Sequence, residues 1–276
     1  MAIKDMLLPL FGNPSPRLIA AIAKCVSVGA SFDAEITALA VEEDVSVRPQ
    51  VMISADFPAE VRNTTDAQGL LKAFDAAVAE VGVRNVQRVA HLRAGEDAPK
   101  HLALCARQKD LSIVPVKPGD DQAERVIEGL IFQSGRPILL CPEELAAELP
   151  VNFDRVIVAW DHSAPAARVV GDALSMLRRA RDVQIITATD GNTLAEQQSG
   201  AAVVRHLAEH GISASFETVR IDGSSVGKIL EAEVKVRGAD LLVMGAYGHY
   251  RLSEWVWGGA TKTIIGRPPC WVIMSH

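Results

Sequence analysis

Four glycines near the C-terminus have the spacing of a loop that can bind phosphate. Gly245 follows a buried-strand run that ends at Met244, and Gly248 comes soon afterwards. Gly258 and Gly259 then precede an apparent helix start. Glycine permits positive φ angles and lets a ligand approach the backbone closely. A helix N-terminus offers unpaired N–H groups and a positive dipole end, so the segment predicts a phosphate site at the carboxyl end of a strand.

A purely structural role is the alternative interpretation of these glycines, which would then shape only the turn and the helix entry. The run Gly258–Thr263 is not a P-loop, because glycines would be needed where Val256 and Thr261 stand. Lys262 is better explained as a solvated helix lysine than as a phosphate ligand.

Asp161, His162 and Ser163 are the residue types of a hydrolase triad. Adjacent side chains point apart and cannot form the required relay, and no GxSxG turn supports it. Turn and capping roles are therefore predicted for Asp161 and Ser163. A small hydrolase using Asp161, His162 or His249 is the least favoured functional hypothesis.

Histidines and cysteines do not show the spacing of a metal site. His206 and His210 lie one helical turn apart, but the sequence offers them no nearby third ligand. No CxxC pair is present, and the apolar neighbours of the cysteines predict buried free thiols. These are Cys25, Cys105, Cys141 and Cys270. Three tryptophans are expected to pack near the site or between domains: Trp255, Trp257 and Trp271.

Apolar strand-like runs alternate with helix-length segments along the whole chain, which predicts an α/β fold with a parallel sheet. The predicted strands are 6–10, 36–41, 86–92, 111–116, 138–141, 155–160, 183–188, 215–221, 241–244 and 270–274. The predicted helices are 16–30, 59–81, 99–108, 122–132, 165–180, 193–210, 224–237 and one beginning near 258. Ser163 is the predicted N-cap of helix 165–180, and Gly211 and Gly238 are predicted to end helices.

Local matches between the halves predict a duplicated unit. Lys109-Asp110-Leu111 corresponds to Ala239-Asp240-Leu241, each before a predicted strand. The predicted domains are residues 1–145 and 151–276. The charged segment Glu143–Val151 is the predicted linker.

The second half resembles the ATP-binding branch of the universal stress proteins. Gly245, Gly248 and Gly258 match that family's G-x2-G-x9-G signature after the fourth strand. Asp161 matches its acidic residue near the nucleoside, and Ala188 falls where the family contacts adenine. The resemblance covers residues 151–276 and, more weakly, 1–142.

This resemblance implies two tandem open-sheet domains, each a five-stranded, mostly parallel, Rossmann-like sheet of the adenine-nucleotide α-hydrolase type with helices on both faces. The halves would pair through their last strands as a pseudo-dimer, and two chains could pair again as a homodimer. The implied ligand is ATP or AMP, with no metal beyond the Mg²⁺ that accompanies a nucleotide. The implied binding residues are Asp161, Ala188, Met244, Gly245, Gly248, Gly258, Gly259, Ala260 and Thr261.

Two departures from the family pattern bear on ligand binding. The family's Ser or Thr after the third glycine is Gly259 here, which removes one hydrogen bond to phosphate, about 1 kcal/mol, unless Thr261 or Thr263 supplies a hydroxyl. The first half has one glycine, Gly119, followed by two carboxylates, Asp120 and Asp121. We therefore expect the first half to bind no nucleotide and to have a structural, pairing role.

Composition narrows the function further. The net charge of −6 without a basic block argues against nucleic-acid binding. No apolar run is long enough to span a membrane, and a cytoplasmic location is expected. The leading hypothesis is a stress-associated protein that binds an adenine nucleotide as a sensor or regulator. It is not expected to be an enzyme, beyond very slow ATP hydrolysis at most. The alternative is a nucleotide-free interaction or scaffold protein that acts through domain pairing and protein partners.

Overall fold

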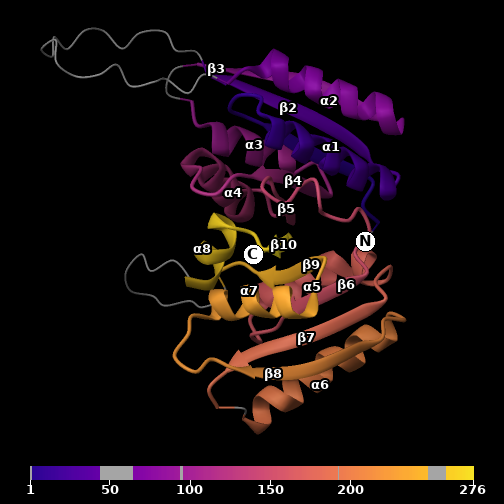
Figure 1. Cartoon of the computed structure of the whole chain (residues 1–276), viewed down its shortest axis with the longest axis vertical. Coiled ribbons are helices and arrows are strands. Elements are labelled where there is room, and N and C mark those ends of the chain that lie inside the picture. Colours follow the sequence, from indigo (N-terminus) through magenta and orange to yellow (C-terminus); the bar gives the residue numbers. More distant parts are fainter. Residues whose placement is uncertain (1, 44–64, 94–95, 192, 248–258) are drawn as a thin grey trace, which may run out of the picture.

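Ten strands form one continuous sheet in the part of the chain that the computed structural model describes, residues 2–43, 65–93, 96–191, 193–247 and 259–276 (Figure 1). The first half contributes β1 (Asp5–Leu10), β2 (Glu35–Glu43), β3 (Asn85–Leu92), β4 (Leu111–Val116) and β5 (Ile138–Pro142). The second half contributes β6 (Arg155–Ala159), β7 (Asp182–Thr189), β8 (Ala214–Arg220), β9 (Leu241–Gly245) and β10 (Trp271–Ser275). The spatial order is β3-β2-β1-β4-β5-β10-β9-β6-β7-β8.

Strands within each half are parallel, and the halves meet where β5 pairs antiparallel with β10. When the strands are numbered along each half, both halves have the order 3-2-1-4-5, which is typical of a doubly wound α/β unit. The predicted α/β class and the predicted pairing through the last strands are confirmed. Whether residues 1–145 and 151–276 fold independently stays a prediction, because one sheet runs through both.

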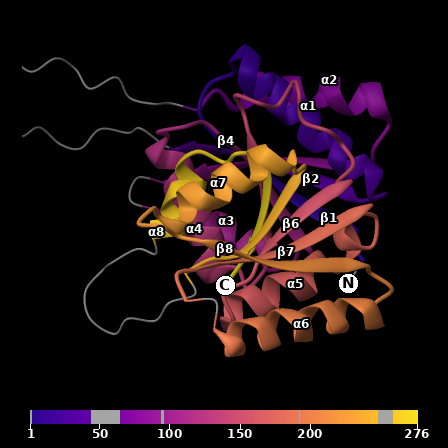
Figure 2. The same cartoon turned by 60° about the horizontal axis from the view of Figure 1, so that its bottom comes forward.

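Helices cover both faces of the sheet, as predicted. One face carries α1 (Pro16–Ser31), α2 (Ala67–Val81), α5 (Ala164–Leu177) and α6 (Leu194–Glu209) over one apolar core cluster. The other face carries α3 (Ala98–Ala106), α4 (Asp121–Gln133), α7 (Val226–Arg237) and α8 (Gly259–Gly266) over a second cluster. Figure 2 shows α5 and α6 on one side of β7 and β8, with α7 on the other.

Helix boundaries follow the expected local chemistry. Ser163 caps α5, since its Oγ accepts the Ala166 N–H at 3.2 Å, and a proline occupies the first turn. Gly238 ends α7 with a φ of 58° in the left-handed region. The predicted helix 59–81 is described only from Ala67 onward as α2, and the part of that prediction before residue 65 lies outside the described residues.

One pair of aspartates marks the duplication at atomic level. Asp110 Oδ2 accepts the N–H groups of Lys4 and Asp5, at 2.8 and 3.1 Å, at the start of β1. Asp240 Oδ2 does the same for Asp154 and Arg155, at 3.0 and 2.9 Å, at the start of β6. The same device at the same place in both halves supports the duplication predicted from the sequence.

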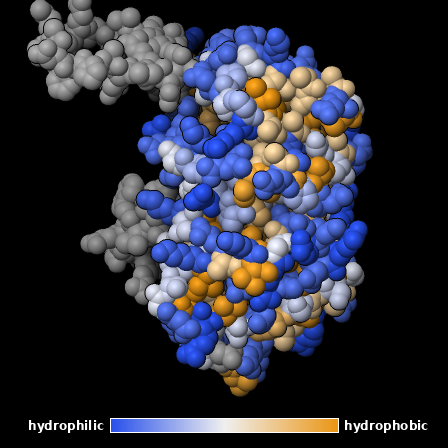
Figure 3. All heavy atoms as spheres, viewed as in Figure 1, coloured by the Kyte–Doolittle hydropathy of each residue, from blue (hydrophilic) through white to orange (hydrophobic). Residues whose placement is uncertain are grey.

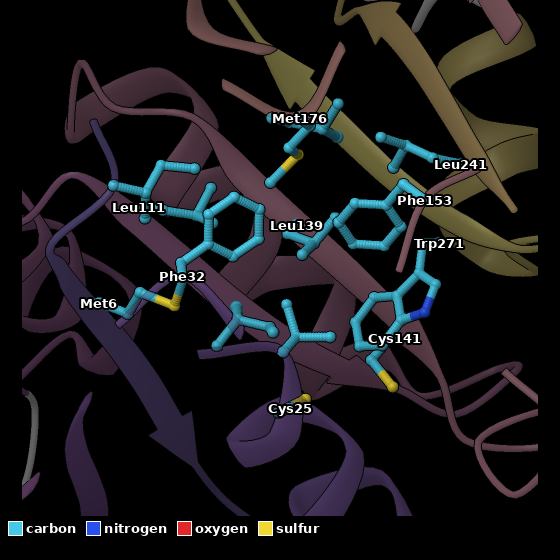
Figure 4. Close-up of a cluster of buried hydrophobic side chains, with 14 of the residues drawn as sticks. Met6, Cys25, Phe32, Leu111, Leu139, Cys141, Phe153, Met176, Leu241 and Trp271 are labelled. Atoms are coloured by element: carbon cyan, nitrogen blue, oxygen red, sulfur yellow. The ribbon is translucent and has the colours of Figure 1, made fainter. Parts of the chain in front are cut away.

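An aromatic cluster closes the core where the halves join (Figure 4). Trp271 of β10 is fully buried, meets Phe153 edge to face at 6.0 Å, and donates its indole N–H to the Pro150 carbonyl at 3.0 Å. Phe153 also lies 6.5 Å from Phe32 of the first half. The prediction that Trp271 packs between the halves is confirmed. The predicted linker is itself part of the core, because Ala146 is buried there.

Thiol burial differs from expectation at one position. Cys25, Cys141 and Cys270 are buried, whereas Cys105 is half-exposed, so the prediction of a buried thiol is wrong there. Cys105 lies on α3, partly buried against the second core cluster.

The face of the molecule shown in Figure 3 is largely polar, with apolar patches between the polar residues. Large hydrophobic side chains that are exposed include Leu194, Val236 and Phe132. Among the described helices, none has the length and apolar content needed to cross a membrane.

Replacing Asp240 with Ala is expected to lower the free energy of unfolding by about 1–2 kcal/mol, because two backbone N–H groups lose their acceptor. Asp240→Asn keeps an acceptor oxygen and should lose less. Urea denaturation followed by circular dichroism measures both. An Asp240→Ala protein as stable as the wild type would show that water replaces the carboxylate without cost.

Candidate functional site

A pocket of about 310 Å³ opens at the carboxyl ends of β6, β7 and β9 in the second half. It contains seven of the nine predicted binding residues: Asp161, Ala188, Met244, Gly245, Gly259, Ala260 and Thr261. The other two, Gly248 and Gly258, lie outside the described residues. Parallel strands bring their carboxyl ends to one edge, so residues far apart in sequence converge there.

Apolar side chains that the sequence reasoning missed form most of the pocket wall. Ile186, Val226 and Leu230 line it together with Met244, all on the face of the sheet that α7 and α8 cover, and Trp160 borders it at the end of β6. Ile186 and Ala188 share one face of β7 because side chains alternate along a strand. Val226 and Leu230 are four residues apart on α7 and share a helix face. Strand alternation and helix spacing are thus the sequence features that could have identified these wall residues. Together the residues form a slot suited to a flat, apolar ring.

Trp160 is held in place from behind. It is only 9% exposed, and its indole N–H donates to Ser199 Oγ at 2.8 Å. The Trp160 ring therefore packs on the opposite face of the sheet, where α6 carries Ser199, and this contact fixes the end of β6 beside the pocket.

Gly245 has a packing reason to be glycine. A Cβ at this position would lie 2.5 Å from the Ala166 backbone nitrogen and 2.7 Å from the Pro165 carbonyl carbon. The end of β9 thus passes directly against the first turn of α5, and a backbone neighbour cannot move aside as a side chain can. This close approach fixes the end of β9 against α5 whether or not a ligand is bound.

The loop after Gly245 is tied to α8 by one hydrogen bond. Tyr247 has a φ of 56°, and its backbone N–H donates to Thr261 Oγ1 at 3.2 Å. Its ring packs on Phe132 of α4 at 4.8 Å between centroids. A residue of the first half thus supports the loop of the second-half pocket.

The N-terminus of α8 faces the pocket through Gly259, Ala260 and Thr261. The Thr263 hydroxyl donates to the Gly259 carbonyl at 2.8 Å, so its proton is already used. The Thr261 hydroxyl accepts from Tyr247 and donates to no acceptor among the described residues. Of the two threonines considered as substitutes for the missing family hydroxyl, only Thr261 lines the pocket.

Asp161 forms a turn rather than a catalytic relay. Its Oδ1 accepts the Ser163 N–H at 3.0 Å, and Ser163 Oγ is engaged in capping α5. His162 adopts a φ of 66° between them. The predicted turn and capping roles are confirmed, and Asp161 keeps a second carboxylate oxygen at the pocket mouth.

The remaining residues considered from the sequence do not line this pocket, or they lie outside the described residues. His206 and His210 contact each other at 4.9 Å between ring centroids, and no three His, Cys, Asp or Glu residues of the described chain are placed to hold a metal ion. Lys262 is exposed on α8, where it borders a separate hollow together with Glu124 and Glu128 of α4. His249, Trp255 and Trp257 lie outside the described residues.

Comparison with known proteins assigns the second half to a family. Residues 152–276 match the model of the Universal stress protein family. The C-terminal half of the chain belongs to this family. A search of curated proteins found no significant match.

Solved structures with the same fold extend over both halves. A universal stress protein from Archaeoglobus fulgidus DSM 4304 is 18% identical over 98% of this chain and 97% of its own, with a TM-score of 0.68. A protein of unknown function from Pseudomonas aeruginosa PAO1 is 13% identical over 99% of this chain and 92% of its own, with a TM-score of 0.61. At these identities the likeness establishes the shared tandem fold.

Gly245 of the stress-protein motif and Gly259, which stands in place of the family's Ser or Thr, should respond differently to Ala. Gly245→Ala is expected to cost about 1–3 kcal/mol in unfolding free energy without any ligand, because its Cβ meets backbone atoms. Gly259→Ala should be neutral or stabilising, since no atom of the described residues lies within 4 Å of its Cβ position and alanine favours helices. Thermal denaturation of the ligand-free proteins compares them. Equal stabilities would refute the assigned packing role of Gly245.

Proposed function

We propose that the universal stress protein domain in the second half binds an adenine nucleotide and acts as a sensor or regulator. The observation that carries this proposal is the convergence of seven predicted residues, from three strand ends and a helix start, on one pocket. An apolar slot and a helix N-terminus lie within the same cavity, which is the combination that a nucleotide requires.

Each part of the nucleotide has a suitable place in this proposal. The adenine ring would pack against Ile186 and Ala188. Asp161, with one oxygen unused in the turn, would accept a hydrogen bond from the ribose. The phosphates would bind the backbone N–H groups at the start of α8 and the hydroxyl of Thr261.

A sensor rather than an enzyme is favoured by the ionisable groups around the pocket. Among its described lining residues only Asp161 and Tyr247 titrate. Burial, with Glu128 and Glu124 nearby, raises the pKa of the Tyr247 hydroxyl well above its usual value, so it stays protonated at neutral pH. Neither group offers an efficient general base, so we expect ATP hydrolysis to be very slow at most.

A nucleotide-free interaction protein is the second candidate function. It is favoured by the contact of Gly245 with α5, which explains that glycine without a ligand. In that case the pairing of the two halves would display a surface for a protein partner.

Calorimetric titration with MgATP tests the nucleotide site. Wild-type protein is expected to bind, and Ala188→Phe should abolish binding because the added ring fills the slot. Ala201→Phe, at an exposed position of α6 away from the pocket, is the matched control and should bind as wild type does. No heat at millimolar ATP from folded wild-type protein would overturn the proposal and favour the interaction protein.

Restoring the family hydroxyl should tighten binding. In Gly259→Ser the added Cβ would meet no atom of the described residues within 4 Å, and one hydrogen bond from the new hydroxyl to phosphate is worth about 1 kcal/mol, or roughly a five-fold lower Kd for ATP. Adenosine lacks phosphate, so its affinity should not change. An equal gain for adenosine would show that the hydroxyl does not contact phosphate.

A further inference from the structure

The first half contains a second cavity, of about 620 Å³, at the carboxyl ends of β1 and β4. It lies at the same edge of the sheet as the proposed nucleotide pocket, but it is bordered by the starts of α1 and α4 instead of by the counterparts of β7 and α7. Its chemistry is different, because charged side chains replace most of the apolar slot. The charged residues are Lys117, Asp120, Asp121, Arg125 and Glu143.

Glu143 is the buried charge of this cavity. It follows β5, its backbone N–H donates to the Val116 carbonyl at 2.9 Å, and the residue is only 9% exposed. Its carboxylate lines the cavity, yet forms no hydrogen bond or ion pair with any residue that the structure describes. Burial of most of the residue partly shields this carboxylate from solvent, so a cation that enters the cavity meets an acceptor that is already partly desolvated.

The surroundings of Glu143 do not supply that cation. Lys117 and Arg125 are exposed at the rim. Arg17 is engaged with Glu144, at 3.6 Å. Burial and the nearby Asp120 raise the pKa of the Glu143 carboxyl, only partly offset by Lys117 and Arg17.

The cavity is also unsuited to phosphate. Asp120 Oδ1 accepts the N–H groups of Gln122 and Ala123, at 3.0 and 3.1 Å, so the start of α4 already holds a carboxylate. An incoming anion would meet that charge as well as Glu143. This is the physical basis for expecting no nucleotide in the first half.

We propose that this cavity binds a small organic cation whose ammonium group donates hydrogen bonds to the Glu143 carboxylate. Phe11, Leu18 and Pro115 line the same cavity and offer apolar contacts for a carbon skeleton. A bare metal ion fits less well, because no three His, Cys, Asp or Glu residues of the described chain are grouped to hold one. This site is separate from the proposed nucleotide pocket and does not depend on it.

The test uses 1,4-diaminobutane as the cationic probe and 1,4-butanediol as its uncharged counterpart. Saturation-transfer NMR and calorimetry on the full chain should detect the diamine at millimolar concentrations, but not the diol. Glu143→Gln keeps the shape and removes the charge, so diamine affinity should fall at least ten-fold. Glu148→Gln changes an exposed carboxylate just after Glu143 and should leave the affinity unchanged.

Thermal denaturation separates a lost site from a lost fold. Because the pKa of Glu143 is raised in the folded state, its ionised form costs stability above that pKa, and Glu143→Gln should keep or raise the Tm at neutral pH. Its MgATP titration should match wild type. The proposal is overturned if wild type fails to bind the diamine, if the diol binds equally, or if folded Glu143→Gln retains full diamine affinity.

Discussion

The antiparallel pairing of β5 with β10 is the contact on which the rest of the molecule depends. It joins two parallel five-stranded units edge to edge and removes two exposed strand edges that would otherwise invite association. The apolar core beneath it is continuous across the join, with Trp271 and Phe153 facing Phe32 (Figure 4). Separating the halves would expose these rings to water at a cost of several kcal/mol.

That join also brings the first half to the second-half pocket. Helix α4 contributes residues near its start to the first cavity, while Phe132 near its end packs on Tyr247 in the wall of the second. The half without a nucleotide motif is therefore part of the support of the half that has one. The contact between Phe132 and Tyr247 gives the first half a specific structural role beside the second-half pocket.

The two cavities illustrate how a duplicated unit can diverge without a change of fold. Both halves keep the aspartate that anchors the start of the first strand, Asp110 and Asp240, because it secures sheet geometry. At the strand ends, where the sheet needs nothing further, one half has an apolar slot beside a helix N-terminus. The other has a buried glutamate beside a helix N-terminus already occupied by Asp120. The need for a stable sheet constrains the aspartates at the strand starts, whereas the residues at the carboxyl ends of the strands can vary with the ligand.

The sequence by itself determined the α/β class, nearly every strand and helix, and the family signature, because these follow from local periodicity, capping and glycine spacing. Ser163 and Gly238 act as their neighbours predicted, since a cap depends only on the adjacent turn. Tertiary structure alone decided that Gly245 packs against Ala166, that Leu230 lines the same pocket as Ala188, and that Glu143 is buried without a described partner. These facts depend on which strand ends and helices meet, and contacts between residues far apart in the chain leave no local pattern to detect.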